Sequence, residues 1–324
     1  MKERINYWRR IFKVYLTKDK GYLNFWHEKP AVSKDIDPQK LGAYYMTFED
    51  KANYTGPRDK NGVIMFDYFS NIGRQYNPVA IAQYGLGNYN LYRKTKDEKY
   101  LKEAITHAEW LISHLETNEK NVPVWRHHFE WHYKEILPPG WYSALSQGCG
   151  ISLLMRVYKE TKNDIYLKTA DGAFEALTIE MENGGVRHRD VDGNIWLEEY
   201  MVDPPTHIIN GFLWAIWGVW DYWLVTENKK AKTLFDACVK TLEKNMHRYD
   251  AGYWSRYDLS KQAMKMLASP FYHALHVVQL EATYLLTGNP IFEAYRKKFD
   301  AYQQSWFKRK RAFIYKAIFK LIYF

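Results

Sequence analysis

The chain has 324 residues and a formal net charge of +9, and 47% of its residues are hydrophobic. This length suits one large domain or two small ones, and the hydrophobic fraction excludes a disordered chain. Only two cysteines are present, Cys149 and Cys238, which excludes a disulfide framework or a cysteine-rich zinc module and favours a reducing, cytoplasmic compartment.

The positive charge is concentrated at the two ends of the chain. Residues 1–20 contribute +5 and residues 308–324 contribute +6, so the body between them is slightly acidic, which argues against nucleic-acid binding. Both ends place apolar residues at helical spacing among Lys and Arg. This pattern is typical of a helix lying on an anionic membrane surface, and also of a terminal helix packed on the protein body. We expect neither a secretory signal nor a membrane span.

Residues 41–70 contain turn signals, including Asn61-Gly62, and predict short strands. After them the sequence repeats. Four segments predict paired helices, at about 78–115, 142–178, 208–245 and 272–306. A tyrosine near the end of each first helix recurs at spacings of 66, 64 and 62 residues, at Tyr92, Tyr158, Tyr222 and Tyr284. A similar polar turn follows each of them.

A helical hairpin cannot bury its own apolar face, so repeated hairpins stack on one another. The first helix of each pair is apolar nearly all round, most clearly in 208–220, which predicts an inner layer with the second helices outside. This favours an all-α fold, an α/α toroid (barrel) of about four hairpins, over a short solenoid. The expected organisation is an N-terminal helix and β-rich segment at 1–70, the toroid at 71–307, and a basic amphipathic tail at 308–324.

Three long connectors link the hairpins, and each leaves an outer helix and enters an inner one. They are connector 1 (118–141), connector 2 (181–207) and connector 3 (247–270). We therefore expect them at one rim of the toroid, with a β-hairpin in connector 2. They concentrate acids, bases, Arg and aromatic residues, which suits an anionic sugar but is also ordinary for surface loops. His128 and His132 lack the neighbours of a zinc site, so we predict no metal.

Five strings along the chain resemble, in order, the C-terminal catalytic domain of D-glucuronyl C5-epimerases, which convert glucuronate to iduronate within a polysaccharide. The strings are Tyr76 to Leu86; Pro139 to Ala144 with Gln147-Gly148; Trp196 to Tyr200 with Asn210-Gly211-Phe212; Tyr257-Asp258-Leu259; and Tyr272-His273 with His276. The resemblance covers about residues 70–300. It implies an α/α barrel and an epimerase that needs no cofactor.

By motif match, the resemblance implies four catalytic residues: Glu199, Tyr200, Tyr257 and Tyr272. The candidate substrate-binding residues are Tyr84, Trp141, Tyr142, Gln147, Arg187, Asn210, Arg256, Lys261 and His273. Two features depart from the family. The Arg of its Tyr-Asp-Leu-Arg string is Ser260 here, with Arg256 or Lys261 as candidate replacements, and the β-rich N-terminal part of the animal enzymes is missing or much reduced.

The chemistry of epimerisation needs one group to remove the weakly acidic C5 proton and another to return a proton from the opposite face. Glu199 could be a base if burial raises its pKa, and a tyrosine is a good acid because its reference pKa is about 10. We hypothesise that Glu199 and Tyr272 lie on opposite faces of the sugar, with Tyr200 and Tyr257 binding it or assisting. Packing tyrosines without chemistry are the alternative for each phenol.

Two other functions stay open. A polysaccharide lyase on the same barrel begins with the same proton abstraction, and a non-catalytic glycan-binding protein of polysaccharide assembly would share the cleft. A hydrolase is less favoured, because Glu198 and Glu199 are adjacent and point to opposite faces of a strand. The expected partner is a glucuronate-containing polysaccharide or lipid-linked glycan. The basic ends predict peripheral membrane contact, and a homodimer stays open.

Overall fold

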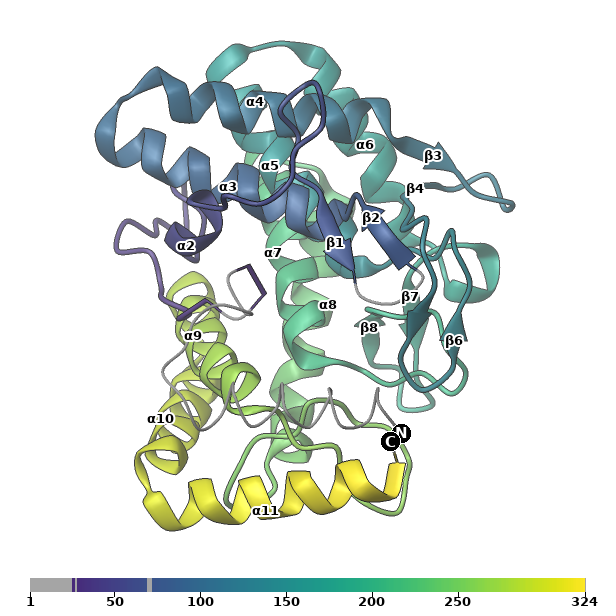
Figure 1. The fold of residues 1–324 in the computed structure, drawn as a ribbon, viewed down its shortest axis with the longest axis vertical. Helices are drawn as coiled ribbons and strands as arrows, with labels where there is room; N and C mark the ends of the chain where they lie inside the picture. The colour runs from purple at the N-terminus through teal and green to yellow at the C-terminus, as the bar shows by residue number, and fades with distance from the viewer. Residues whose placement is uncertain (1–24, 27, 69–71, 324) are drawn as a thin grey trace.

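The computed structural model describes residues 25–26, 28–68 and 72–323, and its architecture is shown in Figure 1. The predicted N-terminal amphipathic helix lies outside the described residues. Four helical hairpins form the predicted α/α toroid. The inner helices are α3 (Pro78–Thr95), α5 (Ala144–Thr161), α7 (Ile209–Thr226) and α9 (Pro270–Thr287), and the outer helices are α4 (Glu98–Ser113), α6 (Asp164–Thr178), α8 (Lys229–Asn245) and α10 (Pro290–Gln304). Along the chain, each inner helix packs on the next.

The four hairpins share one turn chemistry, which explains the repeat in the sequence. Each inner helix ends at a residue in the left-handed conformation, with φ between 53° and 66°, and the next residue is the N-cap of the outer helix. The caps bond the backbone N–H two residues on; they are Asp97, Asn163, Asn228 and Asn289. Such caps satisfy helix ends that would otherwise be unpaired, so each turn ends one helix and starts another.

Helices α5 and α7 approach so closely that their backbones touch. A Cβ added at Gly148 would lie 2.5 Å from Ala215 Cα, and one added at Gly218 would lie 2.3 Å from the Gly148 carbonyl oxygen. Only glycine fits such an approach without displacing backbone. This contact fixes the spacing of the two helices whose first turns carry the connectors.

The two ends of the toroid differ. At the C-terminal ends of the inner helices, Arg156 and Asp221 form a fully buried ion pair, with Nη1 2.6 Å from Oδ2. The Tyr45 hydroxyl donates to Asp221 Oδ1 at 2.5 Å, and Arg156 Nε donates to the Gly42 carbonyl at 3.1 Å. The segment before the short helix α2 (Glu49–Ala52) thus covers this end and is joined to it by a buried polar network.

The connectors enter at the opposite, N-terminal ends of the inner helices and form short antiparallel hairpins there. Strands β3 (Leu115–Thr117) and β4 (Pro123–Trp125) pair, as do β5 (Trp131–His132) with β6 (Ile136–Leu137) and β7 (Arg187–Arg189) with β8 (Ile195–Leu197). The hairpin predicted in connector 2 is β7–β8. Strands β1 (Phe66–Tyr68) and β2 (Gly73–Gln75) form one more antiparallel pair just before α3.

The chain continues into helix α11 (Trp306–Tyr323), which follows α10 and forms one outer edge of the molecule (Figure 1). Among the described residues, no helix is both long enough and apolar enough to cross a membrane.

Candidate active site at the connector rim

The site is built around the carboxyl group of Glu199, which follows strand β8. Its side chain is buried, with the residue 5% exposed, and its Oε2 accepts a hydrogen bond of 3.3 Å from Asn210 Nδ2 on the first turn of α7. The next residue of that turn is Gly211, where an added Cβ would lie 2.3 Å from the same carboxylate oxygen. The first turn of α7 is therefore shaped to receive this carboxyl group.

Burial raises the pKa of Glu199 to about 8, because the charged carboxylate loses its solvation there. Hydrogen bonding from the neighbouring Tyr200 hydroxyl and from Asn210 lowers the pKa, while the charge of Glu198 raises it. A carboxyl group with such a pKa exchanges protons near neutral pH and, when ionised, is a stronger base than an exposed glutamate.

The structure brings three tyrosines together beside this carboxyl group. Tyr200 and Tyr257 are each 8% exposed and lie in one small buried cluster, against which the partly exposed Tyr272 packs. The rings of Tyr257 and Tyr272 meet edge to face with centroids 5.0 Å apart. Burial, followed by the charge of Glu199, raises the pKa of Tyr200 and Tyr257 well above the ordinary value, so both phenols keep their protons. Tyr200 and Tyr257 thus lie close enough to Glu199 to feel its charge, and Tyr272 packs on Tyr257.

Glu198 has a different role from its neighbour. It is fully buried, its Oε2 accepts the backbone N–H of His207 at 3.0 Å, and its Oε1 pairs with the ring of His207. The His207 ring in turn stacks on Trp196 with centroids 4.2 Å apart. The two adjacent carboxyl groups therefore face different partners, as their spacing predicts, and Glu198 fixes the end of connector 2.

Aromatic residues of connector 1 form one wall of the site. Trp141 and Tyr133 pack on the Tyr200 ring, with centroids 5.6 Å and 4.5 Å away. The Tyr133 hydroxyl donates to Asp258 Oδ2 at 2.7 Å, and Lys134 Nζ lies 3.5 Å from the same oxygen. Neither Tyr133 nor Lys134 is among the predicted substrate contacts, since their partner Asp258 lies far along the chain and no local pattern marks it.

Ser260 stands at the position of the family's missing Arg, and its hydroxyl is hydrogen-bonded to Asp258. Ser260 Oγ donates to Asp258 Oδ1 at 2.6 Å. Of the two candidate replacements, Lys261 is exposed, whereas Arg256 is partly buried and its Nε has no hydrogen-bond partner among the described residues. Burial lowers the pKa of Arg256, and the charge of Asp258 opposes that shift. Arg256 and Lys134 are thus two cations near the buried Asp258.

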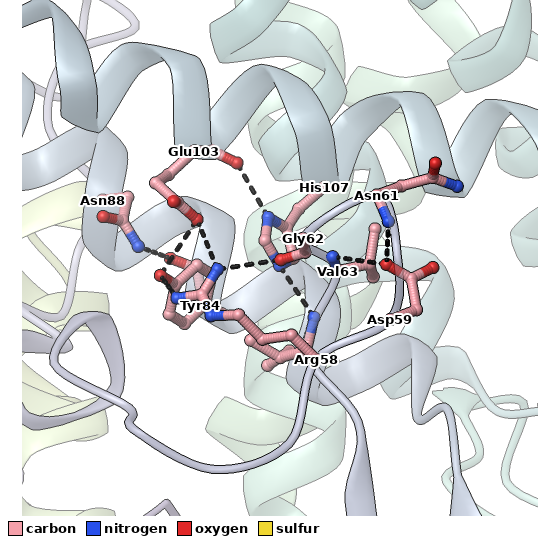
Figure 2. A network of polar contacts seen from close by, with 10 residues as sticks. Arg58, Asp59, Asn61, Gly62, Val63, Tyr84, Asn88, Glu103 and His107 are labelled. Carbon is pink, nitrogen blue, oxygen red and sulfur yellow. Dashed lines mark hydrogen bonds and ion pairs between the residues drawn. The ribbon is translucent and has the colours of Figure 1, made fainter.

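Tyr84 lies away from this cluster, in a network that holds loop 58–63 against helices α3 and α4 (Figure 2). Its hydroxyl donates to Glu103 Oε2 at 3.0 Å and accepts from the guanidinium of Arg58. The ring of His107 packs beside it, and His107 Nε2 accepts the backbone N–H of Ile64. Tyr84 is 2% exposed and its hydroxyl is already paired, so it has a structural role here.

Gln147 and His273, two further predicted substrate contacts, are fully buried and serve as anchors. Gln147 Oε1 accepts the backbone N–H of Trp125 at 3.0 Å, and its Nε2 donates to the Ala173 carbonyl, joining α5 to β4 and α6. His273 stacks on Trp254 and bonds the Phe299 carbonyl of α10 through Nε2. Their side chains have no surface left for a substrate.

The remaining predicted contacts lie at the rim with other partners. Arg187 Nε lies 3.1 Å from Glu180 Oε1, and Tyr142 packs beside a small buried cluster that includes Val122 and Val124. Asn210 is the exception, because its Oδ1 is buried beside Glu199 with no hydrogen-bond partner among the described residues.

His128 and His132 do not converge on a shared ligand. His128 Nε2 lies 2.6 Å from Glu116, and His132 Nε2 lies 2.7 Å from Glu130. Within the part of the chain that the structure describes, no group of three or more His, Cys, Asp or Glu side chains is placed to hold a metal ion.

The fold and site define an α/α-toroid protein with a buried carboxyl group and three phenols gathered at one rim. A sequence model for the C-terminus of D-glucuronyl C5-epimerase matches residues 118–301, more than half of the chain. The chain belongs to this family. The matched range starts after the first of the five strings that resemble the family, and it contains the four predicted catalytic residues.

Individual relatives are similar over different lengths. A D-glucuronyl C5-epimerase of Caenorhabditis elegans is 37% identical over 192 residues, which cover 54% of this chain but only 30% of the worm protein. An uncharacterised protein of Methanocaldococcus jannaschii is 32% identical over 243 residues, covering 70% of this chain and 77% of its own length.

Solved structures are similar at lower sequence identity. A family 76 glycoside hydrolase (mannosidase) of Bacteroides thetaiotaomicron has a TM-score of 0.46 at 16% identity, covering 74% of this chain and 60% of that one. An unsaturated glucuronyl hydrolase specific for heparin has a TM-score of 0.47 at 12% identity, covering 68% and 60%.

Proposed function

We propose that this protein is a polysaccharide uronate C5-epimerase that converts D-glucuronate residues to L-iduronate. The observation that carries the proposal is the buried Glu199, with its raised pKa, whose charge acts on Tyr257, the ring of which packs on Tyr272. Family membership supports it, and the worm relative bears the name of this activity.

Proton abstraction is the difficult step, because the C5 hydrogen next to a carboxylate is a very weak acid. A base whose pKa lies well above that of an ordinary glutamate narrows the gap to the carbon acid. Glu199 has that property because burial disfavours its charge. In this proposal Glu199 faces one side of the sugar ring and takes or returns the C5 proton.

The opposite face needs a proton donor, and a phenol supplies it. Tyr272 is the candidate, because it is the more exposed member of the tyrosine pair and can contact a ring held between it and Glu199. Tyr200 and Tyr257, which keep their protons, would hold the sugar carboxylate or assist the transfer. Two transfers on opposite faces invert C5 without breaking the chain.

The intermediate carries a second negative charge on the sugar carboxyl group, which the protein must stabilise with fixed donors and cations. Lys134 pairs with Asp258, and Arg256 lies near the same carboxylate, so both cations are at the rim where they would offset the negative charge of the intermediate. The phenols would donate hydrogen bonds to it. In this proposal, the two cations take the place of the family's Arg that is Ser260 here.

A uronate lyase is the second candidate, because the same base and the same phenols could expel the 4-linked sugar after proton abstraction. The two activities differ in their products. A lyase shortens the polymer and leaves an unsaturated uronate that absorbs in the ultraviolet, whereas an epimerase does neither.

The test is incubation of the protein with an unsulfated glucuronate polymer in D₂O, followed by NMR. An epimerase gives deuterium at C5 and new iduronate signals at constant chain length and ultraviolet absorbance. Falling chain length with rising absorbance would establish the lyase instead. Saturable binding of the polymer without any deuterium incorporation would contradict both and leave a glycan-binding protein.

A further inference from the structure

Helix α11 carries an unusual share of exposed apolar surface. Of the twelve large apolar side chains that the structure shows exposed within its described residues, eight lie on this one helix. They are Trp306, Phe307, Phe313, Ile314, Ile318, Leu321, Ile322 and Tyr323, with exposures from 38% to 79%. Clustered exposed apolar residues mark an interaction surface, whereas single ones are common on any protein.

Helix α11 has apolar side chains on its solvent side as well as on its protein side. Phe307, Ile314, Ile318 and Leu321 follow spacings of seven, four and three residues, so they share one face, and that face points to solvent. On the protein side, Ala312 and Phe319 are buried, and the partly buried Lys316 donates to the Leu267 carbonyl of connector 3. Burial lowers the pKa of Lys316 to about 7. Lysine thus points inward while isoleucine and leucine point outward.

The charge of α11 complements an anionic partner. The helix contains six Lys and Arg and no acidic residue. Of these, Arg309, Lys310 and Arg311 are exposed next to the apolar face. A face of this composition, apolar and bordered by cations, is the pattern of a helix in the plane of a bilayer that contains anionic lipid.

A groove of about 760 Å³ runs between α11 and connector 3. Its lining combines the cations Lys265, Lys310 and Arg311 with apolar side chains such as Ile314 and Ile318. The cations can hold a phosphate headgroup while the apolar side chains contact an acyl chain. Because connector 3 also carries Arg256 and Tyr257, this groove lies on the same connector as the candidate active site.

We propose that α11 is a membrane-docking helix that seats on bilayers containing anionic phospholipid, with its apolar face in the headgroup boundary. In Figure 1 the helix lies along one outer edge of the molecule, which leaves its length accessible to a flat surface. Docking of this kind holds the connector rim close to the bilayer, where a lipid-linked or growing polysaccharide chain would be reached. The proposal does not depend on which reaction the site performs.

The experiment is flotation of the full-length protein with vesicles, either of phosphatidylcholine alone or of an equimolar mixture with phosphatidylglycerol. The protein is expected to float with the anionic vesicles and not with the neutral ones, and high salt is expected to weaken the binding. The variant Ile314→Ser/Ile318→Ser should lower the partition coefficient at least tenfold. Its matched control, Ile165→Ser/Val191→Ser, removes two exposed apolar side chains elsewhere and should bind like wild type.

A second pair of variants tests the electrostatic contribution to vesicle binding. Lys310→Glu/Arg311→Glu should lose binding to anionic vesicles, while Lys229→Glu/Lys230→Glu, the same charge change on exposed residues of α8, should retain most of it. All of these positions are exposed, so folding should survive, and circular dichroism checks it. The proposal is overturned if wild type ignores anionic vesicles, if it binds neutral ones equally, or if the α11 variants float like wild type. It is also overturned if the serine variant turns a dimer into a monomer with vesicle binding unchanged, because the face then binds a second copy.

Discussion

At the scale of single residues, the site depends on the environment of one carboxyl group. Glu199 is buried, receives hydrogen bonds from Asn210 at 3.3 Å and from the Tyr200 hydroxyl, and fits against the α7 backbone because Gly211 has no side chain. Burial makes the charged form of Glu199 costly by more than the hydrogen bonds recover, and the cost appears as the raised pKa. A carboxyl group with a pKa raised this far is found more often at functional sites than in structural cores.

The raised pKa of Glu199 predicts a specific pH dependence of stability. Below about pH 4.5 the carboxyl group is neutral in both the folded and the unfolded chain. Between about 4.5 and 8 the unfolded chain releases the proton while the folded protein retains it, so this group's contribution to stability is lost as pH rises. The upper bound of the loss is about 5 kcal/mol, because one pKa unit corresponds to about 1.4 kcal/mol.

The variant Glu199→Gln cannot ionise, so its free energy of unfolding should rise relative to wild type over that pH range. Urea unfolding of both proteins at several pH values measures the difference. Other shifted groups, such as Glu28 with its pKa raised to about 7 by burial, are common to both proteins and cancel. A difference that stays constant from about pH 5 to 8 would contradict the assigned environment of Glu199.

Gly211 offers a second test at this scale. In Gly211→Ala the added methyl group would lie 2.3 Å from the Glu199 oxygen, so the carboxyl group must move. A displacement of about 1 Å at a catalytic group costs on the order of 100-fold in rate, which we expect for turnover of the polymer. The control is Gly172→Ala on α6, where the nearest atom is 3.4 Å away. Equal turnover by both variants would argue against Glu199 as a catalytic group.

Some residues of the site could be predicted from the sequence and others could not. Glu199 and the three tyrosines were predicted through the ordered strings that resemble the family, since nothing local distinguishes them from packed residues. Gln147 and His273 were predicted with them, but their side chains are hydrogen-bonded to backbone carbonyls far along the chain. The role of Tyr133 could not be predicted, because it depends on a contact with Asp258 that only the folded rim creates.

At the scale of elements, the hairpin repeat could be predicted well because its cause is local. Each turn combines a left-handed residue with an Asp or Asn cap, and both signals are present in the sequence. The inner helices could be distinguished from the outer ones because they are apolar all round. What the sequence did not reveal is how closely α5 and α7 pack, since a glycine in a helix does not show which backbone it touches.

That close contact predicts a large effect from a small substitution. In Gly218→Ala the new methyl group would meet the Gly148 backbone at 2.3 Å, and the two helices must separate. Overpacking of this kind typically costs about 1–3 kcal/mol, which thermal or urea unfolding would detect. Gly172→Ala should be neutral or slightly stabilising, since alanine favours a helix where there is room. Unchanged stability of Gly218→Ala would show that the helices are further apart than described.

At the scale of the whole molecule, the two ends of the toroid have separate tasks. One end is covered by the segment containing Tyr45 and held by the buried pair of Arg156 and Asp221, and the other carries the connectors and the site. The sequence predicted the connector rim from chain direction alone. It could not predict that segment 41–48 covers the far end, nor that α11 turns its apolar face outward, because both depend on long-range packing.

In the proposed reaction, one carboxyl group and one phenol at this rim exchange the C5 proton of a uronate. Deuterium incorporation into a glucuronate polymer in D₂O should fall by about 1,000-fold or more in Glu199→Gln and in Tyr272→Phe, given the usual contribution of a general acid or base. Tyr222→Phe, which removes a hydroxyl bonded to Asp171 far from the rim, should keep the wild-type rate. Wild-type exchange by either site variant, or no exchange by wild type itself, would contradict the account.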